Sequence, residues 1–487
     1  MTKNITVVGG GTAGWLAAFM LSNIYKHNVT VIESSKISII GVGEGGTHIL
    51  GSLINSRNEF GFSVKDFMIA TDATPKMSVK HKGWPNTYSI PLDLLPNSND
   101  EDFLPFILSK NKPMHLTTEI GLLIENRKVP IRSDETGIWD SSDFSYHFDG
   151  HKVGLYLKHK TNATVIDAVV TEVVIDESGN IDKLRLDNGE FNKADLYIDC
   201  TGFQKILMTA LKTKWISYSK HLLMNTAMPF RTVWSKIDRS VKNIQPVTEA
   251  ESLNAGWTWS IPLIHSKGMG YVFCEEFCTP EQAVLELNEK YSKTHGEINP
   301  TRTIKFEPGR LEKAWDKNCI ALGLASAFVE PLEATSIHAT KIQIDELGKA
   351  LATNSSQDVY NSDVSQLYDE IKDFIVLHYL GGRDDTEFWK YIKNTDITTD
   401  RLKEILEISK HRFLTQEDIP NKFNSLNYRA WNQVLAGLGK FDKTVIDNTL
   451  TNGVEERYNS WHTQVLEKAR DYKNLDECLE RNAEWWL

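Results

Sequence analysis

Apolar and polar positions alternate along the amino-terminal part of the chain in the manner of short strands and helices joined by turns. Residues 5–8 and 29–33 are β-branched runs that predict two strands, and residues 15–21 between them predict an apolar helix. A predicted hairpin at 165–186 leads into an apolar strand at 196–199. This order of elements predicts an α/β fold that begins with a βαβ unit.

From about Ser336 onward the periodicity changes. Apolar residues recur at three- and four-residue spacing over 341–351, 364–379 and 399–409, which predicts amphipathic helices. The carboxyl-terminal third is therefore expected to form a helical layer beside the α/β part.

Composition excludes several classes of partner. At 487 residues the chain exceeds what one hydrophobic core usually serves, and its net charge of -11 argues against nucleic acid and anionic membranes. Five scattered cysteines lack zinc-type spacing, so we interpret them as reduced thiols and expect no metal site. No apolar run approaches the roughly 20 residues of a membrane helix, and no signal-like segment precedes the first strand. We expect a cytoplasmic protein with a small-molecule substrate.

A glycine-rich turn joins the first predicted strand to the first predicted helix. Its residues are Gly9, Gly10, Gly11, Thr12, Ala13 and Gly14. Glycines in the Gly-x-Gly-x-x-Gly positions permit a tight turn and let backbone amides approach a pyrophosphate at the helix amino terminus. Glu33 ends the next strand, where a carboxylate accepts hydrogen bonds from ribose hydroxyls. The pattern predicts dinucleotide binding, with a purely structural glycine turn as the alternative.

Four other segments carry a more specific signature. They are Gly256-Trp257-Thr258-Trp259-Ser260-Ile261-Pro262, the loop Gly41-Val42-Gly43-Glu44, the strand and turn at 195–203, and the strand, loop and helix start at 318–338. In these segments, and from end to end, the chain resembles the flavin-dependent halogenases of the tryptophan-halogenase type.

The resemblance implies an FAD-binding domain of the Rossmann-like, glutathione-reductase/hydroxylase type with a mostly helical substrate-side region. We expect this domain over 1–340, with inserted substrate-side segments around 85–160 and 210–300, and a helical cap region over 341–487. The resemblance assigns further cofactor contacts to Gly41, Gly43, Glu44, Thr47, Val169, Leu324 and Ile337.

The resemblance also implies a two-component reaction. FADH2 comes from a separate NAD(P)H-dependent flavin reductase, and the chain shows no second nucleotide fingerprint of its own. Reduced FAD and oxygen then convert a halide ion into hypohalous acid, which travels through a tunnel to an electron-rich indole, phenol or pyrrole. Trp257 and Trp259 would line that tunnel, although core packing on one strand face is the alternative. The oligomeric state stays open, a homo-oligomer included.

By the same resemblance, Lys76 is the catalytic lysine. It would donate a hydrogen bond to hypohalous acid or form a haloamine. Lys80 and Lys82 would share its face on a regular strand, so spacing alone does not choose among the three. Glu333 would orient the oxidant and accept the ring proton, with a favourable helix-dipole interaction as its structural alternative.

Thr335 and Ser336 follow Glu333 at a predicted helix start, where free amides suit a halide ion. Ala334 and the pair Gly45-Gly46 replace larger or hydroxyl-bearing residues of the usual family pattern. We therefore expect a roomier, less polar halide site that favours bromide over chloride.

Two other functions remain open from the sequence alone. A flavin-dependent aromatic hydroxylase would use the same cofactor without Lys76 or Glu333, and a catalytically silent flavoprotein would bind a partner instead. Halide-dependent product formation separates the three functions. The histidines in 146–149 and 374–379 are interpreted as structural, since buried polar groups often belong to packing networks.

Overall fold

A six-stranded sheet forms the predicted nucleotide-binding part. The computed structural model describes residues 2–37, 43–55, 61–84, 86–92, 100–133, 139–140, 144–233, 244–300, 302–420, 422–423 and 426–483. The strand order is β11 (Thr164–Asp167), β2 (Asn28–Glu33), β1 (Asn4–Val8), β15 (Leu196–Asp199), β24 (Cys319–Ala321) and β23 (Trp315–Asp316). All neighbours pair in parallel except β23, which is antiparallel to β24.

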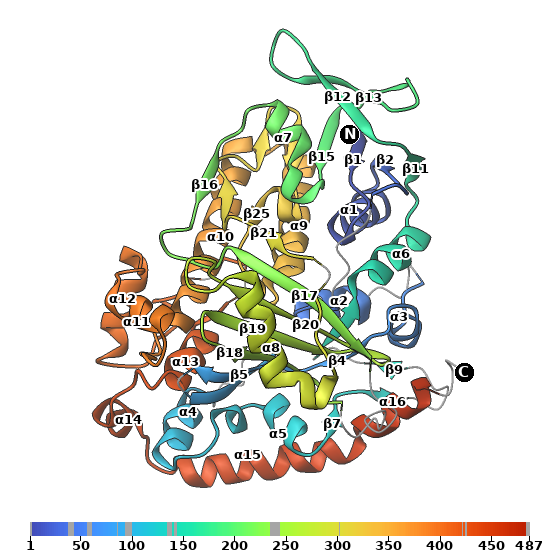
Figure 1. Cartoon of the computed structure of the whole chain (residues 1–487). Coiled ribbons are helices and arrows are strands. Elements are labelled where there is room, and N and C mark those ends of the chain that lie inside the picture. The colour runs from blue at the N-terminus through green and yellow to red at the C-terminus, as the bar shows by residue number, and fades with distance from the viewer. Residues whose placement is uncertain are drawn as a thin grey trace.

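The βαβ unit follows from the apolar pattern of the first residues. β1 is buried from Ile5 to Val8, as a strand covered on both faces requires. Helix α1 (Thr12–Phe19) buries every position from Gly14 onward and continues as a π-helical turn over Met20–Ile24. The predicted hairpin is also present: β12 (Val170–Ile175) and β13 (Ile181–Leu186) project from the top of the molecule in Figure 1 before the chain returns to β15.

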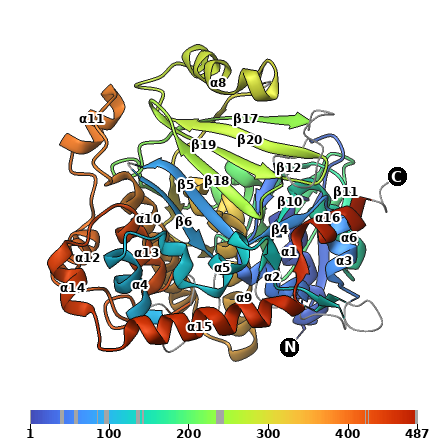
Figure 2. The ribbon, with the colours of Figure 1, turned by 90° about the horizontal axis from the view of Figure 1, so that it is seen from below.

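A second, seven-stranded sheet was not anticipated from the sequence. Its order is β21 (Ile304–Lys305), β17 (Thr226–Val233), β20 (Ser266–Phe273), β19 (Gly256–Pro262), β18 (Val247–Ser252), β5 (Ser78–Trp84) and β6 (Asn86–Pro91). β18 pairs in parallel with β5, which joins two segments that are far apart in the sequence. Helix α8 (Pro280–His295) lies outside this sheet (Figure 2).

A three-stranded sheet packs against the seven-stranded sheet. β10 (Ser145–Asp149) pairs with β3 (Gly43–Gly45) on one side and with β4 (Thr74–Lys76) on the other, both antiparallel. Ser145 lies opposite Lys76, and His147 lies opposite Gly45. The sheet therefore brings the Gly43-Glu44 segment beside the strand that carries Lys76.

The carboxyl-terminal part is helical, as predicted. The remaining helices are α2 (His48–Asn55), α3 (Val64–Ala70), α4 (Asp100–Ser109), α5 (Glu119–Glu125), α6 (Gly150–Lys160), α7 (Ile206–Ala210), α9 (Thr335–Thr353), α10 (Gln357–Tyr379), α11 (Glu387–Asn394), α12 (Asp400–Ser409), α13 (Tyr428–Gly437), α14 (Lys443–Thr449), α15 (Val454–Lys468) and α16 (Leu475–Ala483). Figure 2 shows α15 crossing the lower face over α4 and α5. The domain boundary proposed at residue 340 falls inside α9, and the division stays a prediction.

Short strand pairs complete the structure. They are β14 (Phe191–Asn192) with β13, β16 (Trp215–Ser217) with β22 (Gly309–Leu311) and β25 (Ala327–Phe328), β26 (Lys473–Asn474) with β7 (Lys128–Val129), and β8 (Arg132–Ser133) with β9 (Trp139–Asp140). None of the described helices is both long and apolar enough to cross a membrane. The five cysteines, all within the described part, are free.

Candidate functional site

The glycine loop leaves open space where a ligand would approach. Gly9 has a φ of +114°, and a Cβ on Gly14 would lie 1.9 Å from the Gly9 carbonyl oxygen, so both positions require glycine. A Cβ on Gly11 would meet nothing within 4 Å among the described atoms. Gly11 is also the N-cap of α1, and no side chain caps that helix start. Its amides are therefore available to an anion.

Glu33 lies against this loop. A Cβ on Gly10 would lie 2.1 Å from Glu33 Oε2, so the absence of a side chain there admits the carboxylate. Trp15 Nε1 donates to Glu33 Oε2 at 3.2 Å, and Lys158 Nζ donates to Oε1 at 2.5 Å. The two donors hold the carboxylate beside the glycine turn.

The other predicted cofactor residues lie on several elements. Thr12 Oγ1 donates to the Gly150 carbonyl, and Ala13 packs against Gly323. Thr47 Oγ1 lies 2.7 Å from His338 Nδ1. The rest are Gly43 and Glu44 on β3, Leu324 in the 3-10 turn Gly323–Ala325, Ile337 on α9, and Val169 in the short link between β11 and β12. Gly41 lies outside the described residues.

Lys76 is a deeply buried lysine. Its side chain is fully buried, and Nζ has no hydrogen-bond partner among the described residues. Burial lowers the pKa of the Lys76 ammonium to about 8, although the nearby Glu333 carboxylate opposes the shift. A buried amine with a lowered pKa is a candidate reactive group.

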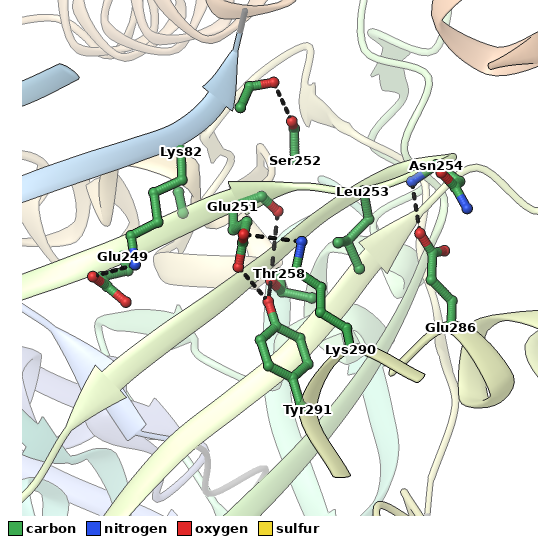
Figure 3. A network of polar contacts seen from close by, with 12 residues as sticks. Lys82, Glu249, Glu251, Ser252, Leu253, Asn254, Thr258, Glu286, Lys290 and Tyr291 are labelled. Carbon is green, nitrogen blue, oxygen red and sulfur yellow. Dashed lines mark hydrogen bonds and ion pairs between the residues drawn. The ribbon is translucent and has the colours of Figure 1, made fainter. Parts of the chain in front are cut away.

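Lys80 and Lys82 do not share this environment. The strand breaks at Met77, so Lys76 belongs to β4 while the other two belong to β5 in the large sheet. Lys82 Nζ pairs with Glu249 at 2.6 Å, beside the Glu251, Lys290 and Tyr291 contacts on the α8 side of that sheet (Figure 3). The strand is not regular across these residues, so the condition under which the three lysines would share one face is not met.

Glu333 lies in a buried cluster with two histidines. His81 Nε2 on β5 is 2.7 Å from Glu333 Oε1, and His378 Nε2 on α10 is 3.0 Å from the same oxygen. Both imidazoles are fully buried and Glu333 is 7% exposed. Burial alone would raise the pKa of Glu333, but contacts with the two imidazoles outweigh it and hold that pKa at about 2. Glu333 is therefore a carboxylate at physiological pH.

The predicted halide residues lie at the start of α9. Ala334 is the N-cap with a left-handed φ of +54° and supplies no capping side chain. Thr335 is buried, and its Oγ1 has no partner within the described structure. Ser336 is partly buried, and its carbonyl accepts from Thr340.

The glycine pair does not open space for a halide. A Cβ on Gly45 would lie 3.0 Å from Lys76 Nζ, and a Cβ on Gly46 would lie 2.7 Å from Ser145 Oγ. The room at Gly45 is occupied by the lysine, so that part of the reasoning behind the bromide preference was wrong. The part that rests on Ala334 stays a prediction.

Trp257 and Trp259 share one face of β19, with ring centroids 6.3 Å apart. Trp257 Nε1 donates to Glu330 Oε2 at 2.7 Å, and the Tyr379 hydroxyl donates to the same oxygen. Burial raises the pKa of Glu330 to about 7 despite these bonds. The second indole lies against Gly270, where a Cβ would collide with its ring. Packing is thus observed, and the tunnel role stays a prediction.

A cavity of about 720 Å³ adjoins the site. Glu333, Thr335, Thr47 and His338 form one part of its wall. Residues from β6, α10 and the α12–α13 region form other parts, including Ile90, Leu92, Ile371, Phe374, Phe413 and Leu414. The Glu333 carboxylate thus faces a chamber of mixed polar and apolar lining that is large enough for an aromatic substrate.

Sequence reasoning missed the contacts of two histidines with Glu333. His147 is structural as expected, because its nitrogens contact the hydroxyls of Thr74 and Thr248. His378 was interpreted in the same way but contacts Glu333, and His81 was not singled out.

These two histidines and Glu333 are also, among the described residues, the three-residue cluster whose geometry could hold a metal ion. A histidine on the same strand segment as a candidate lysine was the available signal for His81.

Comparison with known proteins shows the family of the chain. The family described as tryptophan halogenase matches residues 4–451. Tryptophan 6-halogenase SttH of Streptomyces toxytricini is 30% identical over 483 residues, which cover 89% of each chain. Tryptophan 7-halogenase RebH of Lentzea aerocolonigenes is 27% identical over 486 residues, again 89% of each chain.

Solved structures show the same architecture. Tar14, a tryptophan C-6 flavin-dependent halogenase (chlorinase) from taromycin biosynthesis, superimposes with a TM-score of 0.88 at 26% identity and covers 99% of each chain. BrvH, a flavin-dependent halogenase from Brevundimonas sp. BAL3, gives a TM-score of 0.81 at 25% identity over 99% of each chain. The family match over residues 4–451 shows that the chain belongs to the tryptophan halogenase family of flavin-dependent enzymes.

Proposed function

We propose that the protein is the halogenase component of a two-component system that uses FADH2, oxygen and halide to halogenate an electron-rich aromatic compound of the indole, phenol or pyrrole type. A separate NAD(P)H-dependent reductase supplies the FADH2. The observation that carries the proposal is Lys76, a fully buried amine with no described partner, whose ammonium interacts with the Glu333 carboxylate. Burial of an amine without a hydrogen-bond partner is unfavourable for folding, so its presence indicates a functional role.

The glycine loop fits a dinucleotide cofactor. Its open space at Gly11, the uncapped start of α1 and the adjacent Glu33 carboxylate suit a pyrophosphate and a ribose respectively. Gly9, Gly10, Gly14, Thr12 and Ala13 would complete that site, and the flavin ring would lie toward the residues assigned above on β3, Leu324 and Ile337. When bound, reduced FAD would supply the two electrons that bring oxygen to the peroxide level, at which it can oxidise halide to hypohalous acid.

Lys76 receives and holds the hypohalous acid. In its charged form the ammonium donates a hydrogen bond to the oxidant, and in its neutral form the amine forms a haloamine. Because burial lowers the pKa of this amine to about 8, both forms are populated near that pH. The lack of a competing partner leaves Nζ ready for the oxidant.

Glu333 accepts the proton that the ring loses on substitution. Its low pKa keeps it ionised at neutral pH, and it lines the cavity in which the aromatic ring would bind. Halide would bind at the start of α9, where the free amides and the Thr335 hydroxyl are available beside Ser336. Trp257 and Trp259 would form the wall between the flavin and substrate stations.

Turnover with a substrate panel tests the proposal. Purified protein is combined with FAD, a flavin reductase, NADH and one halide, then offered indoles, phenols and pyrroles, and the products are followed by isotope-resolved mass spectrometry. Halogenated product that requires halide is expected. Hydroxylated product formed without halide would instead identify a hydroxylase.

Substitution of the lysine separates chemistry from flavin binding. Lys76→Ala should abolish halogenation while leaving oxidation of bound FADH2 by oxygen intact. Lys82→Ala is the matched control, because this lysine pairs with Glu249 away from the site. Equal halogenation by wild type and Lys76→Ala would overturn the assignment.

A further inference from the structure

One amide side chain in the wall of the cavity has no hydrogen-bond partner among the described residues. It belongs to Gln433 on α13, which is 8% exposed and lines the cavity together with Glu333. A carboxamide offers two N–H donors and a carbonyl acceptor, and buried groups of this kind are nearly always paired in folded proteins. The partner of Gln433 is therefore to be sought in the molecule that the cavity binds.

The neighbouring amide shows the contrast. Asn432 lines the same cavity, but its Oδ1 accepts from the Leu414 backbone N–H at 2.9 Å and its Nδ2 donates to the Leu414 carbonyl at 2.9 Å. These two bonds tie α13 to the segment that follows α12. Asn432 thus has a structural task, whereas Gln433 forms no such bond within the described part of the chain.

The packing of α13 places Gln433 near the rings that surround Glu333. α13 contacts β6 and α10 (Figure 2). A Cβ on Gly437 would lie 2.4 Å from Tyr88 Cγ, so the helix lies directly against that ring. Tyr88 stacks on His81, which contacts Glu333. Gln433 precedes Gly437 by four residues and so lies one helical turn away on the same face.

The rest of this wall is suited to an aromatic ring. Ile371, Phe374 and Leu414 line the cavity. Trp431 on α13 supports Phe374 from behind, with the two rings edge to face and their centroids 5.2 Å apart. The cavity therefore offers apolar surface for a ring and an unpaired amide for a polar substituent on that ring.

The charged residues of the cavity wall already have partners in the described structure. The pairs are Glu101 with Tyr428, Asp102 with Arg457, Arg412 with Asp418, Arg429 with Tyr428, and Glu333 with His81. An ionised substituent buried beside the neutral Gln433 amide would lack a counter-ion, which is costly in solvation energy. An uncharged hydrogen-bonding group fits this position better than an ammonium or a carboxylate.

We propose that Gln433 determines substrate specificity by hydrogen bonding to an uncharged amide substituent of the aromatic substrate. The substrate class is then neutral aromatic carboxamides and lactams, not free aromatic amino acids. The inference rests on the proposed function and narrows its substrate class. An amide matches Gln433 because each of the two groups presents an N–H donor and a carbonyl acceptor to the other.

Halogenation kinetics of Gln433→Met test the assignment. Methionine has a similar length without the polar atoms of glutamine, so the variant removes the amide and keeps the shape. The probes are indole carboxamides, with the group at each ring position in turn, and the methylindoles substituted at the same positions. Gln433→Met should raise KM for the best carboxamide about 10–100-fold, since a buried group of the substrate loses its partner. KM for the methylindole and kcat for both should change little.

Comparison of each substrate between wild type and variant removes the effect of the substituent on ring reactivity. Gln366→Met is the matched control, because this glutamine is exposed on α10 and donates to Glu370 at 2.8 Å; it should leave the KM values unchanged. Tm of Gln433→Met should not fall, since no bond to a described residue is lost. A lower Tm would assign the amide to folding and overturn the proposal. An equal ratio of carboxamide to methylindole KM in wild type and Gln433→Met would also overturn it.

Binding measurements separate this inference from the proposed function. Isothermal titration calorimetry uses the full-length protein with oxidised FAD and the same probes, plus the indole carboxylates. Gln433→Met should weaken carboxamide binding about 10–100-fold and leave methylindole binding unchanged. Tighter binding of carboxylates than of carboxamides to wild type would overturn the uncharged class. Affinity that depends on Gln433, without any halogenated product, would support the inference and refute the proposed function. Halogenation without a preference that depends on Gln433 would refute the inference alone.

Discussion

Replacing Lys76 by methionine should stabilise the folded protein while abolishing its chemistry. The lysine is fully buried without a described partner, and methionine has similar length and volume without the charge. Burial lowers its pKa from the ordinary 10.5 to about 8. A difference of about 2.5, at roughly 1.36 kcal/mol per pKa unit, corresponds to about 3 kcal/mol of unfolding free energy.

The gain should depend on pH. Below pH 8 the lysine is charged in both the folded and the unfolded chain, so the full difference between variant and wild type is present. Between pH 8 and 10.5 the folded lysine has lost its proton while the unfolded lysine keeps it. The unfolded state then binds more protons, the stability of wild type rises with pH, and the gap closes.

Thermal unfolding of flavin-free protein measures this gap. With about 2.1 cal/mol/K of unfolding entropy per residue, a chain of 487 residues gives about 1 kcal/mol/K, so Tm should rise by about 3 °C at pH 7. Lys82→Met is the control and should bring no gain, because that lysine is partly exposed and paired with Glu249. A lower Tm for Lys76→Met at pH 7, or the same difference at pH 7 and pH 10, would refute the reasoning.

Three further outcomes are expected. Gly11→Val should weaken FAD binding in a fluorescence titration by filling the open space at the loop, and unchanged affinity in a folded variant would contradict the cofactor site. Ala334→Ser should shift the bromide-to-chloride product ratio toward chloride in a mixed-halide assay, whereas an unchanged ratio would separate this residue from halide choice. Trp257→Phe should lower the free energy of unfolding in urea by about 1–3 kcal/mol, because it leaves the buried Glu330 with one donor fewer. Trp259→Phe is its control, since no described carboxylate contacts that indole.

The local part of the fold was predictable because it depends on short-range patterns. β1, the glycine turn and α1 are encoded by neighbouring residues, and the helices of the carboxyl-terminal part by apolar periodicity. The seven-stranded sheet was not predictable in the same way. Its parallel pairing of β18 with β5 joins residues 247–251 to 78–82, and alternation along either strand does not specify a partner.

The candidate site shows the same division. The resemblance assigned Lys76, but the sequence could not show that Lys80 and Lys82 lie in a different sheet, because the break depends on a tertiary hydrogen bond from Met77 to the Pro246 carbonyl. His378 lies on the buried end of α10, where its position looked like core packing. Its contact with Glu333 arises only when α10 packs beside β5, which no local pattern reports.

The long separation between the contacting residues has a consequence for synthesis of the chain. His81 and Glu333 are 252 residues apart, and His378 follows later still. Domains generally fold as the chain emerges from the ribosome, at about 5–20 residues per second. The glycine loop and Lys76 therefore emerge many seconds before the carboxylate and its second histidine. A prematurely terminated chain that ends before Glu333 has the lysine but not the carboxylate, so it would lack the group proposed to accept the ring proton.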